Sequence, residues 1–89
     1  MNSKVFYERF SREIAILGLP DELTEKTKAV SKLFGVTRYM ANGMLFGQLV
    51  PPAEKLDKIA EILDVCSDWL RGATDRKKTY SSRETADTN

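Results

Sequence analysis

Apolar residues recur along the chain at intervals of three and four positions, which is the spacing of one face of an α-helix. In residues 4–17 these positions are Phe6, Phe10, Ile14 and Leu17. Gly18 and Pro20 come next and favour the end of a helix, because glycine readily adopts the left-handed conformation and proline cannot continue the helical hydrogen bonds. The pattern predicts a first helix over residues 4–17 with one buried face.

Two shorter runs have the same spacing. The first begins after Thr24, a residue type favoured as an N-cap, and ends before Gly35. Its apolar positions are Val30, Leu33 and Phe34. The second runs from Thr37, another capping residue, to about Phe46. Its apolar positions are Met40, Ala41, Met44 and Leu45. Both runs are predicted to be short helices, separated by a turn of two residues.

The pair Asn42-Gly43 inside the second of these runs is also a signal for a hairpin turn. The residues on either side of the pair do not alternate between apolar and polar, as those of two paired strands would. A helix is therefore favoured over a hairpin for residues 37–46.

Two further helices are predicted after the rigid connection Pro51-Pro52. Residues 53–63 form the clearest amphipathic pattern, with a stripe of Leu56, Ile59, Ala60 and Leu63. Residues 67–72 give one last turn, in which Trp69 is expected to pack on the core and Gly72 to end the helix. The fold class predicted for residues 1–73 is therefore a compact all-α domain of five helices.

The composition changes after Ala73. Residues 74–89 contain one aromatic side chain, Tyr80, and no aliphatic side chain larger than that of alanine. Such a segment cannot bury enough surface to fold alone, so residues 74–89 are predicted to be a disordered tail or a linker. Its basic run at residues 76–78 fits a soluble linker better than an arm that folds onto DNA.

Composition excludes several classes of function. The chain has 89 residues, no histidine and one cysteine, Cys66, which rules out the usual Cys/His metal sites and the Ser/His and Cys/His nucleophile pairs. No pair of carboxylates and no phosphate-binding loop stands out, so an enzyme, a cofactor and a small-molecule substrate are not expected. No run approaches the about 20 apolar residues of a membrane helix, and the charged N-terminus does not resemble a secretory signal. A cytoplasmic location is predicted.

The net charge is +1, but it is unevenly distributed. Residues 24–47 carry four basic side chains and one acidic one, a balance of +3, whereas residues 48–70 carry two basic and five acidic ones, a balance of −3. A basic helix pair is what contact with DNA phosphates requires. Charge clusters are also common on solvated surfaces, so the pattern alone does not decide between the two.

Residues 28–38 have the parts of a helix-turn-helix: a small Ser31 where two helices approach, Gly35 for a left-handed turn, an apolar Val36, and Thr37 as a cap. The residues beyond this turn make the pattern more specific. The segments GVTR at 35–38, LFG at 45–47, EKLDKIAEILDV at 54–65 and SDWLRG at 67–72 resemble, in order and spacing, the lambda-repressor-like helix-turn-helix domains of the Cro/repressor (Xre) family. The resemblance covers about residues 24–72.

This resemblance implies a phage or prophage repressor type of protein that binds a pseudo-palindromic DNA operator as a homodimer and controls transcription. The chain departs from the family pattern where glutamine, alanine and a larger aromatic residue are common, and it places a glycine within the expected recognition helix. These four positions are Thr27, Ser31, Met44 and Gly43.

The helical spacing of residues 37–46 leaves four side chains on the outward face: Thr37, Arg38, Tyr39 and Asn42. They are the predicted base-reading residues, because arginine pairs with guanine and asparagine with adenine in the major groove. Thr37 and Tyr39 could contact a thymine methyl or a phosphate. The predicted phosphate contacts are Thr27, Lys28 and, more weakly, Gln48.

An alternative from another class is a protein-interaction module of the same fold, such as an anti-repressor partner, with the acidic helix at 53–63 as its working surface. The chain could also be a small Cro-like regulator or the N-terminal domain of a longer repressor, and its end within a polar stretch favours the second.

Overall fold

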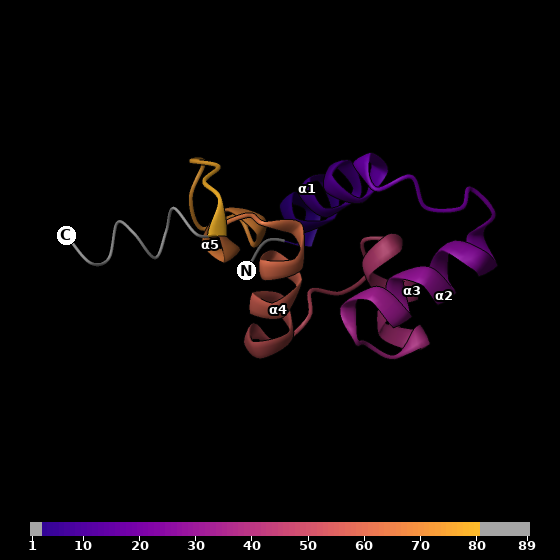
Figure 1. Cartoon of the computed structure of the whole chain (residues 1–89). Helices are drawn as coiled ribbons and strands as arrows, with labels where there is room; N and C mark the ends of the chain where they lie inside the picture. Colours follow the sequence, from indigo (N-terminus) through magenta and orange to yellow (C-terminus); the bar gives the residue numbers. More distant parts are fainter. Residues whose placement is uncertain (1–2, 81–89) are drawn as a thin grey trace.

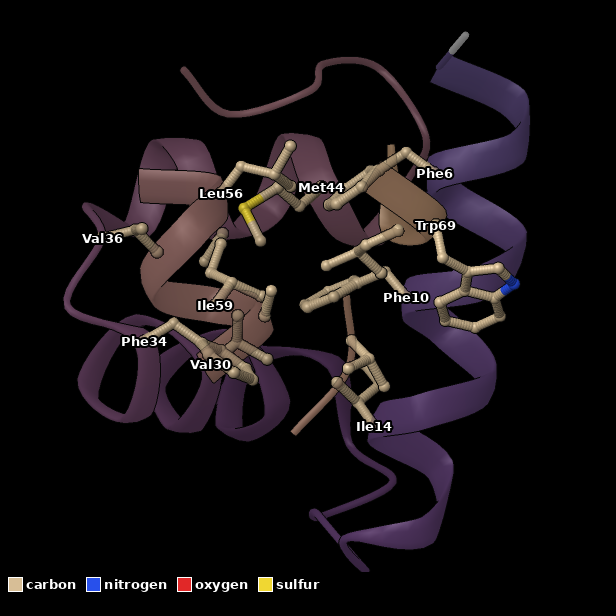
Figure 2. Close-up of a cluster of buried hydrophobic side chains, with 14 of the residues drawn as sticks. Phe6, Phe10, Ile14, Val30, Phe34, Val36, Met44, Leu56, Ile59 and Trp69 are labelled. Atoms are coloured by element: carbon tan, nitrogen blue, oxygen red, sulfur yellow. The ribbon is translucent and has the colours of Figure 1, made fainter. Parts of the chain in front are cut away.

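Helix α1 (Ser3–Ile16) presents an aromatic face to the rest of the protein. The computed structural model describes residues 3–80, and in it Phe6, Phe10 and Ile14 are buried, four residues apart as the sequence pattern predicts. Figure 2 shows these side chains pointing from α1 toward Met44 and Ile59 on the opposite helices. The first predicted helix is therefore confirmed, and it forms one wall of the core.

Four further helices complete the fold, and the described residues contain no strand. They are α2 (Leu23–Phe34), α3 (Arg38–Leu45), α4 (Ala53–Leu63) and α5 (Ser67–Leu70). Helix α1 packs across α3 and α5, while α4 lies against both α5 and α2 (Figure 1). The prediction of an all-α chain of five helices is confirmed, and α4 has the predicted bounds. The alternative hairpin for residues 37–46 is excluded, because this segment is helical.

A single apolar cluster lies at the centre of these helices (Figure 2). Val30 and Phe34 reach it from α2, Ala41 and Met44 from α3, and a stripe of α4 from the opposite side. Trp69 is buried at its edge, as predicted. None of the helices among residues 3–80 is long and apolar enough to cross a membrane.

Two predicted buried positions are wrong. Leu17 lies beyond the end of α1 and is 46% exposed, because its N–H donates to Ile14 O at 3.0 Å and this tighter final turn rotates the side chain away from the buried face. Leu33 is also exposed. It is one residue from Phe34, which is about 100° around a helix, and α2 buries only the narrow stripe that contains Phe34.

The predicted start of the second helix is also wrong. Helix α2 begins at Leu23, before Thr24, and its N-cap is Glu22, whose carboxylate accepts a hydrogen bond from the Glu25 N–H at 3.1 Å. Threonine is the residue type usually preferred at a cap. Here the longer glutamate side chain reaches the amide three residues on, so the helix starts earlier and carries two acidic side chains at its N-terminus.

Residues 74–80, predicted to belong to a disordered tail, run along α1, α4 and α5. We call them the C-terminal segment. The Cys66 N–H donates to Lys78 O at 2.8 Å, and the Tyr80 N–H donates to Asp64 Oδ1 at 3.2 Å. Tyr80 packs against the core cluster. Composition did not predict this docking, because backbone hydrogen bonds and charged side chains hold the segment in place, and it buries few apolar side chains. Residues 81–89 lie outside the described part of the chain.

Charged side chains hold the C-terminal segment on α1. Lys77 Nζ donates to Glu13 Oε2 at 2.7 Å, and the Glu13 side chain is 8% exposed. Arg9 and Lys77 lie over the Trp69 ring, at 4.9 Å and 5.1 Å from its centroid. Arg9 also donates to the carbonyl oxygens of Trp69 and Thr74. The segment is therefore tied to a buried carboxylate and to the edge of the core.

This arrangement predicts that Lys77→Ala lowers the free energy of unfolding by about 1 to 3 kcal/mol, because the nearly buried Glu13 carboxylate loses its hydrogen-bond donor. Urea denaturation followed by circular dichroism measures the change. Lys78→Ala is the matched control, since this neighbouring side chain is exposed, and it should change stability by less than about 0.5 kcal/mol. Equal effects of the two substitutions would contradict the assignment.

Candidate nucleic-acid interface

Helices α2 and α3 make the most extensive contact between any two helices of the structure. We call residues 23–45 the α2–α3 corner. Its turn begins at Gly35, which caps α2 with a left-handed backbone of φ 66° and donates its N–H to Ser31 O. No atom lies within 4 Å of the place that a Gly35 Cβ would occupy. The backbone conformation alone, rather than space, therefore requires glycine here.

Hydrogen bonds from α2 and from α4 hold the turn in place. Ser31 Oγ donates to Val36 O at 2.6 Å, and the Val36 N–H donates to Ser31 O at 3.1 Å. From α4, Lys55 Nζ donates to Gly35 O at 3.2 Å. Val36 is buried beneath the turn. Ser31 is therefore more than a small residue at a close approach, because its hydroxyl fixes the path of the chain into α3.

Helix α3 is short and sharply divided into an inner and an outer side. Thr37 caps it, since its Oγ1 accepts a hydrogen bond from the Met40 N–H at 3.0 Å. The buried residues of α3 are Ala41, Gly43 and Met44. Arg38, Tyr39 and Asn42 are all exposed, and Tyr39 is 83% exposed. The corner therefore presents three chemically different side chains on the first turns of α3.

Two shallow hollows lie along this outer side. The first, of about 320 Å³, lies between the N-terminal half of α2 and the start of α3. Its lining is Leu23, Thr24, Thr27, Lys28, Arg38, Tyr39 and Asn42. The second, of about 420 Å³, lies along the C-terminal half of α3. Its lining is Tyr39, Asn42, Gly43, Phe46, Gln48 and Leu49. Tyr39 and Asn42 separate the two hollows.

Most of the predicted site residues are thus brought together. Five of them line the first hollow: Thr27, Lys28, Arg38, Tyr39 and Asn42. Gln48 lines the second hollow together with Tyr39 and Asn42. Thr37 lines neither hollow, and its hydroxyl oxygen is engaged in capping α3.

Thr27 differs from the exposed phosphate contact that its position in the sequence indicates. It is 9% exposed, and its Oγ1 donates to Leu23 O at 2.9 Å, so the single hydroxyl proton is already used inside α2. The amides that a helix leaves unpaired belong to its first turn, whereas the Lys26 N–H already donates to Glu22 O at 2.8 Å. Thr27 shapes the wall of the first hollow.

The charge around the first hollow is only moderately positive. Lys28 pairs with Glu25 at 3.6 Å, and Glu22 caps the same end of α2. Within residues 3–80 the Arg38 guanidinium makes no hydrogen bond and no ion pair. Arg38 is therefore the cation of this surface that is available to an external anion or base.

Sequence reasoning missed five residues of the surface, which are Leu23, Thr24, Gly43, Phe46 and Leu49. The apolar pattern places Leu23 and Thr24 outside the second helix, and it gives Phe46 and Leu49 no role beyond a helix end and a loop. Gly43 is the signal that could have found Leu49. A Cβ at Gly43 would lie 2.5 Å from Leu49 Cδ2 and 2.7 Å from Leu49 Cγ. Because Gly43 has no side chain, Leu49 can pack directly against α3 at this position.

Comparison with known proteins adds nothing to this geometry: no protein-family model, no curated protein sequence and no solved structure matches the chain. Residues 3–80 also contain no group of three or more His, Cys, Asp or Glu side chains placed to hold a metal ion.

The contact between Gly43 and Leu49 gives a stability prediction. Gly43→Ala should lower the free energy of unfolding by roughly 1 kcal/mol, because an overpacking cost of about 1 to 3 kcal/mol exceeds the gain in helix propensity of about 1 kcal/mol.

In a Leu49→Ala background the same substitution should instead raise stability by about 1 kcal/mol, since only the propensity gain remains. Chemical denaturation of the four variants forms a double-mutant cycle. The same sign in both backgrounds would show that Leu49 does not occupy the space beside Gly43.

Proposed function

We propose that the chain is a sequence-specific double-stranded DNA-binding transcription regulator of the phage or prophage repressor type, which binds a pseudo-palindromic operator as a homodimer. In this proposal the α2–α3 corner is a helix-turn-helix, with α3 in the major groove and α2 crossing the phosphate backbone. The observation that carries it is the exposure of Arg38, Tyr39 and Asn42 together on the first turns of α3, beyond a turn fixed by Gly35 and Ser31.

The chemistry of these side chains suits the major groove. Arg38 can donate two hydrogen bonds to guanine O6 and N7, and Asn42 can pair with adenine N6 and N7. An α-helix with its side chains is about 10 to 12 Å across, and the major groove is about 12 Å wide. Ala41 and Met44 of α3 are buried in the core, and Met40 and Leu45 also pack against it, so the core contacts of this short helix stay covered while its exposed side chains face outward.

Phosphate contact is expected at Lys28 and Gln48. Both side chains are exposed; Lys28 lines the first hollow and Gln48 lines the second. The first turn of α2 is a poor phosphate site, because the Glu22 and Glu25 carboxylates lie there and would repel a phosphate group. In this proposal the contacts to the DNA phosphate backbone are therefore made beside α3 and not at the N-terminus of α2.

Dimeric binding and repression come from the resemblance of residues 24–72 to lambda-repressor-like domains. A protein dimer reads two inverted half-sites, and occupancy of an operator excludes other proteins from the same DNA. The moderate positive charge around the corner fits a dimer, since two copies double the number of phosphate contacts.

A second candidate is a protein-interaction module of the same fold. It is favoured by one observation: Leu23, Tyr39 and Phe46 are large, exposed and apolar, and all three line the hollows along α3. Exposed apolar groups are typical of protein contacts as well as of base contacts. The two candidates differ in whether duplex DNA binds at all.

Selection from randomised duplexes at physiological salt tests the proposal. The full chain is expected to enrich two inverted half-sites with centres about 10 base pairs apart or a multiple of this. Retention without enrichment that disappears as the salt concentration rises would reflect electrostatic association alone. That result would contradict sequence-specific regulation and favour the interaction module.

Substitution of Arg38 gives a residue-level prediction. Arg38→Ala should weaken binding to the selected site by about 1 to 3 kcal/mol and relax one base position per half-site. Lys28→Ala should instead weaken all sequences alike and reduce the slope of affinity against salt concentration. Fluorescence anisotropy with selected and random duplexes measures both effects.

Lys58→Ala is the control, because this exposed lysine lies on α4 away from both hollows. Equal losses on selected and random DNA for Arg38→Ala would identify Arg38 as a phosphate contact and not a base contact.

A further inference from the structure

The second hollow along α3 differs in chemistry from the first. The first is bordered by the cations Lys28 and Arg38, whereas no charged side chain lines the second. Tyr39 and Phe46 form two of its walls, and Leu49 lies in it over Gly43. Phe46 is 52% exposed and Tyr39 more so. An uncharged hollow that is lined by Tyr39, Phe46 and Leu49 therefore lies beside the predicted base-reading residues Tyr39 and Asn42.

The polar groups of this hollow are few. Asn42 and Gln48 are exposed at its border and offer amide groups, and Tyr39 offers one hydroxyl. An amide can bond to an adenine edge or to a phosphate, but no cation is present to pair with guanine O6 and N7 or to neutralise a phosphate. The lining thus offers no cation to guanine, and Tyr39, Phe46 and Leu49 are the side chains through which it can contact an apolar group.

Among the four bases only thymine presents an apolar group in the major groove, its C5-methyl. We propose that the second hollow receives a thymine methyl group, so that Tyr39, Phe46 and Leu49 determine a thymine within each half-site. This inference rests on the proposed function and deepens it, because it names what one part of the surface reads. Asn42, between the two hollows, then lies beside an A·T pair whose adenine it can bond.

The position of this thymine is set by the length of the helix. Gly43 and Phe46 are five and eight residues beyond Arg38, which is about 7 to 12 Å along an α-helix. Base pairs are spaced about 3.4 Å apart along the duplex. With α3 lying along the groove, the thymine is expected about two to four base pairs from the position that Arg38 reads.

Removal of single thymine methyl groups from the DNA tests the proposal that the second hollow receives one of them. In the selected duplex each thymine is replaced in turn by deoxyuridine, which pairs identically but lacks the methyl group, and binding of the full chain is measured by anisotropy. At one thymine per half-site, two to four base pairs from the position relaxed by Arg38→Ala, affinity should fall about fourfold. That factor corresponds to burial of one methyl group, about 0.8 kcal/mol.

A protein variant assigns the effect to the hollow. Phe46→Ala should bind thymine and deoxyuridine duplexes within a factor of two of each other. Ile16→Ala is the matched control, because Ile16 is 76% exposed, is also apolar and lines neither hollow, and it should keep the fourfold discrimination. Thermal unfolding of both variants by circular dichroism checks that the fold is intact.

The failures are distinguishable. Enrichment of a specific site whose deoxyuridine duplexes all bind as tightly as the thymine duplex would overturn the inference and leave the proposed function standing. Discrimination that persists unchanged in Phe46→Ala would also overturn it, since the methyl would then lie elsewhere. Absence of any enriched duplex would overturn both, and would point to an apolar protein segment as the occupant of the hollow.

Discussion

The packing of Phe10 of α1 on Phe34 of α2 sets the geometry of the whole fold. The two rings lie 5.6 Å apart and are tilted by 59°, and Phe10 is also stacked on Phe6 at 5.3 Å. Phe34 is the last residue of α2 and directly precedes Gly35. Anchoring its ring in the core therefore holds the end of α2 in place, at the point where the chain turns toward α3.

That constraint helps to explain how so short a helix as α3 is held in place. An isolated helix of eight residues is unstable in water, so α3 exists because Ala41 and Met44 pack on the core and Thr37 caps its start. The inner side packs on the core through Ala41 and Met44. The outer side is free of such demands. Its mixture of a cation, an amide and aromatic rings is therefore not required by the packing of the core.

The distribution of charge has a structural as well as a functional side. Acidic groups at the start of α2 reduce the positive potential at this helix N-terminus. The positive charge around the first hollow therefore comes from Arg38 and Lys28. In the C-terminal segment, Lys77 is engaged by Glu13 and by the Trp69 ring. Part of the basic run that could have served as a DNA-binding arm is therefore committed to the fold.

Local patterns in the amino-acid sequence were enough to establish the number and order of the helices, the bounds of α4, the turn at Gly35, and the exposure of Arg38, Tyr39 and Asn42, because helical spacing and glycine are local signals. The remaining features depended on tertiary packing. Glu22 rather than Thr24 caps α2, and the Thr27 hydroxyl donates its hydrogen bond within the helix. Leu49 packs over Gly43 and lines the second hollow. The docking of residues 74–80 was likewise hidden, because a polar segment gives no hydrophobic pattern and is held by distant partners, such as Glu13, 64 residues before Lys77. Such contacts depend on which surfaces the fold brings together, and no spacing along the chain encodes them.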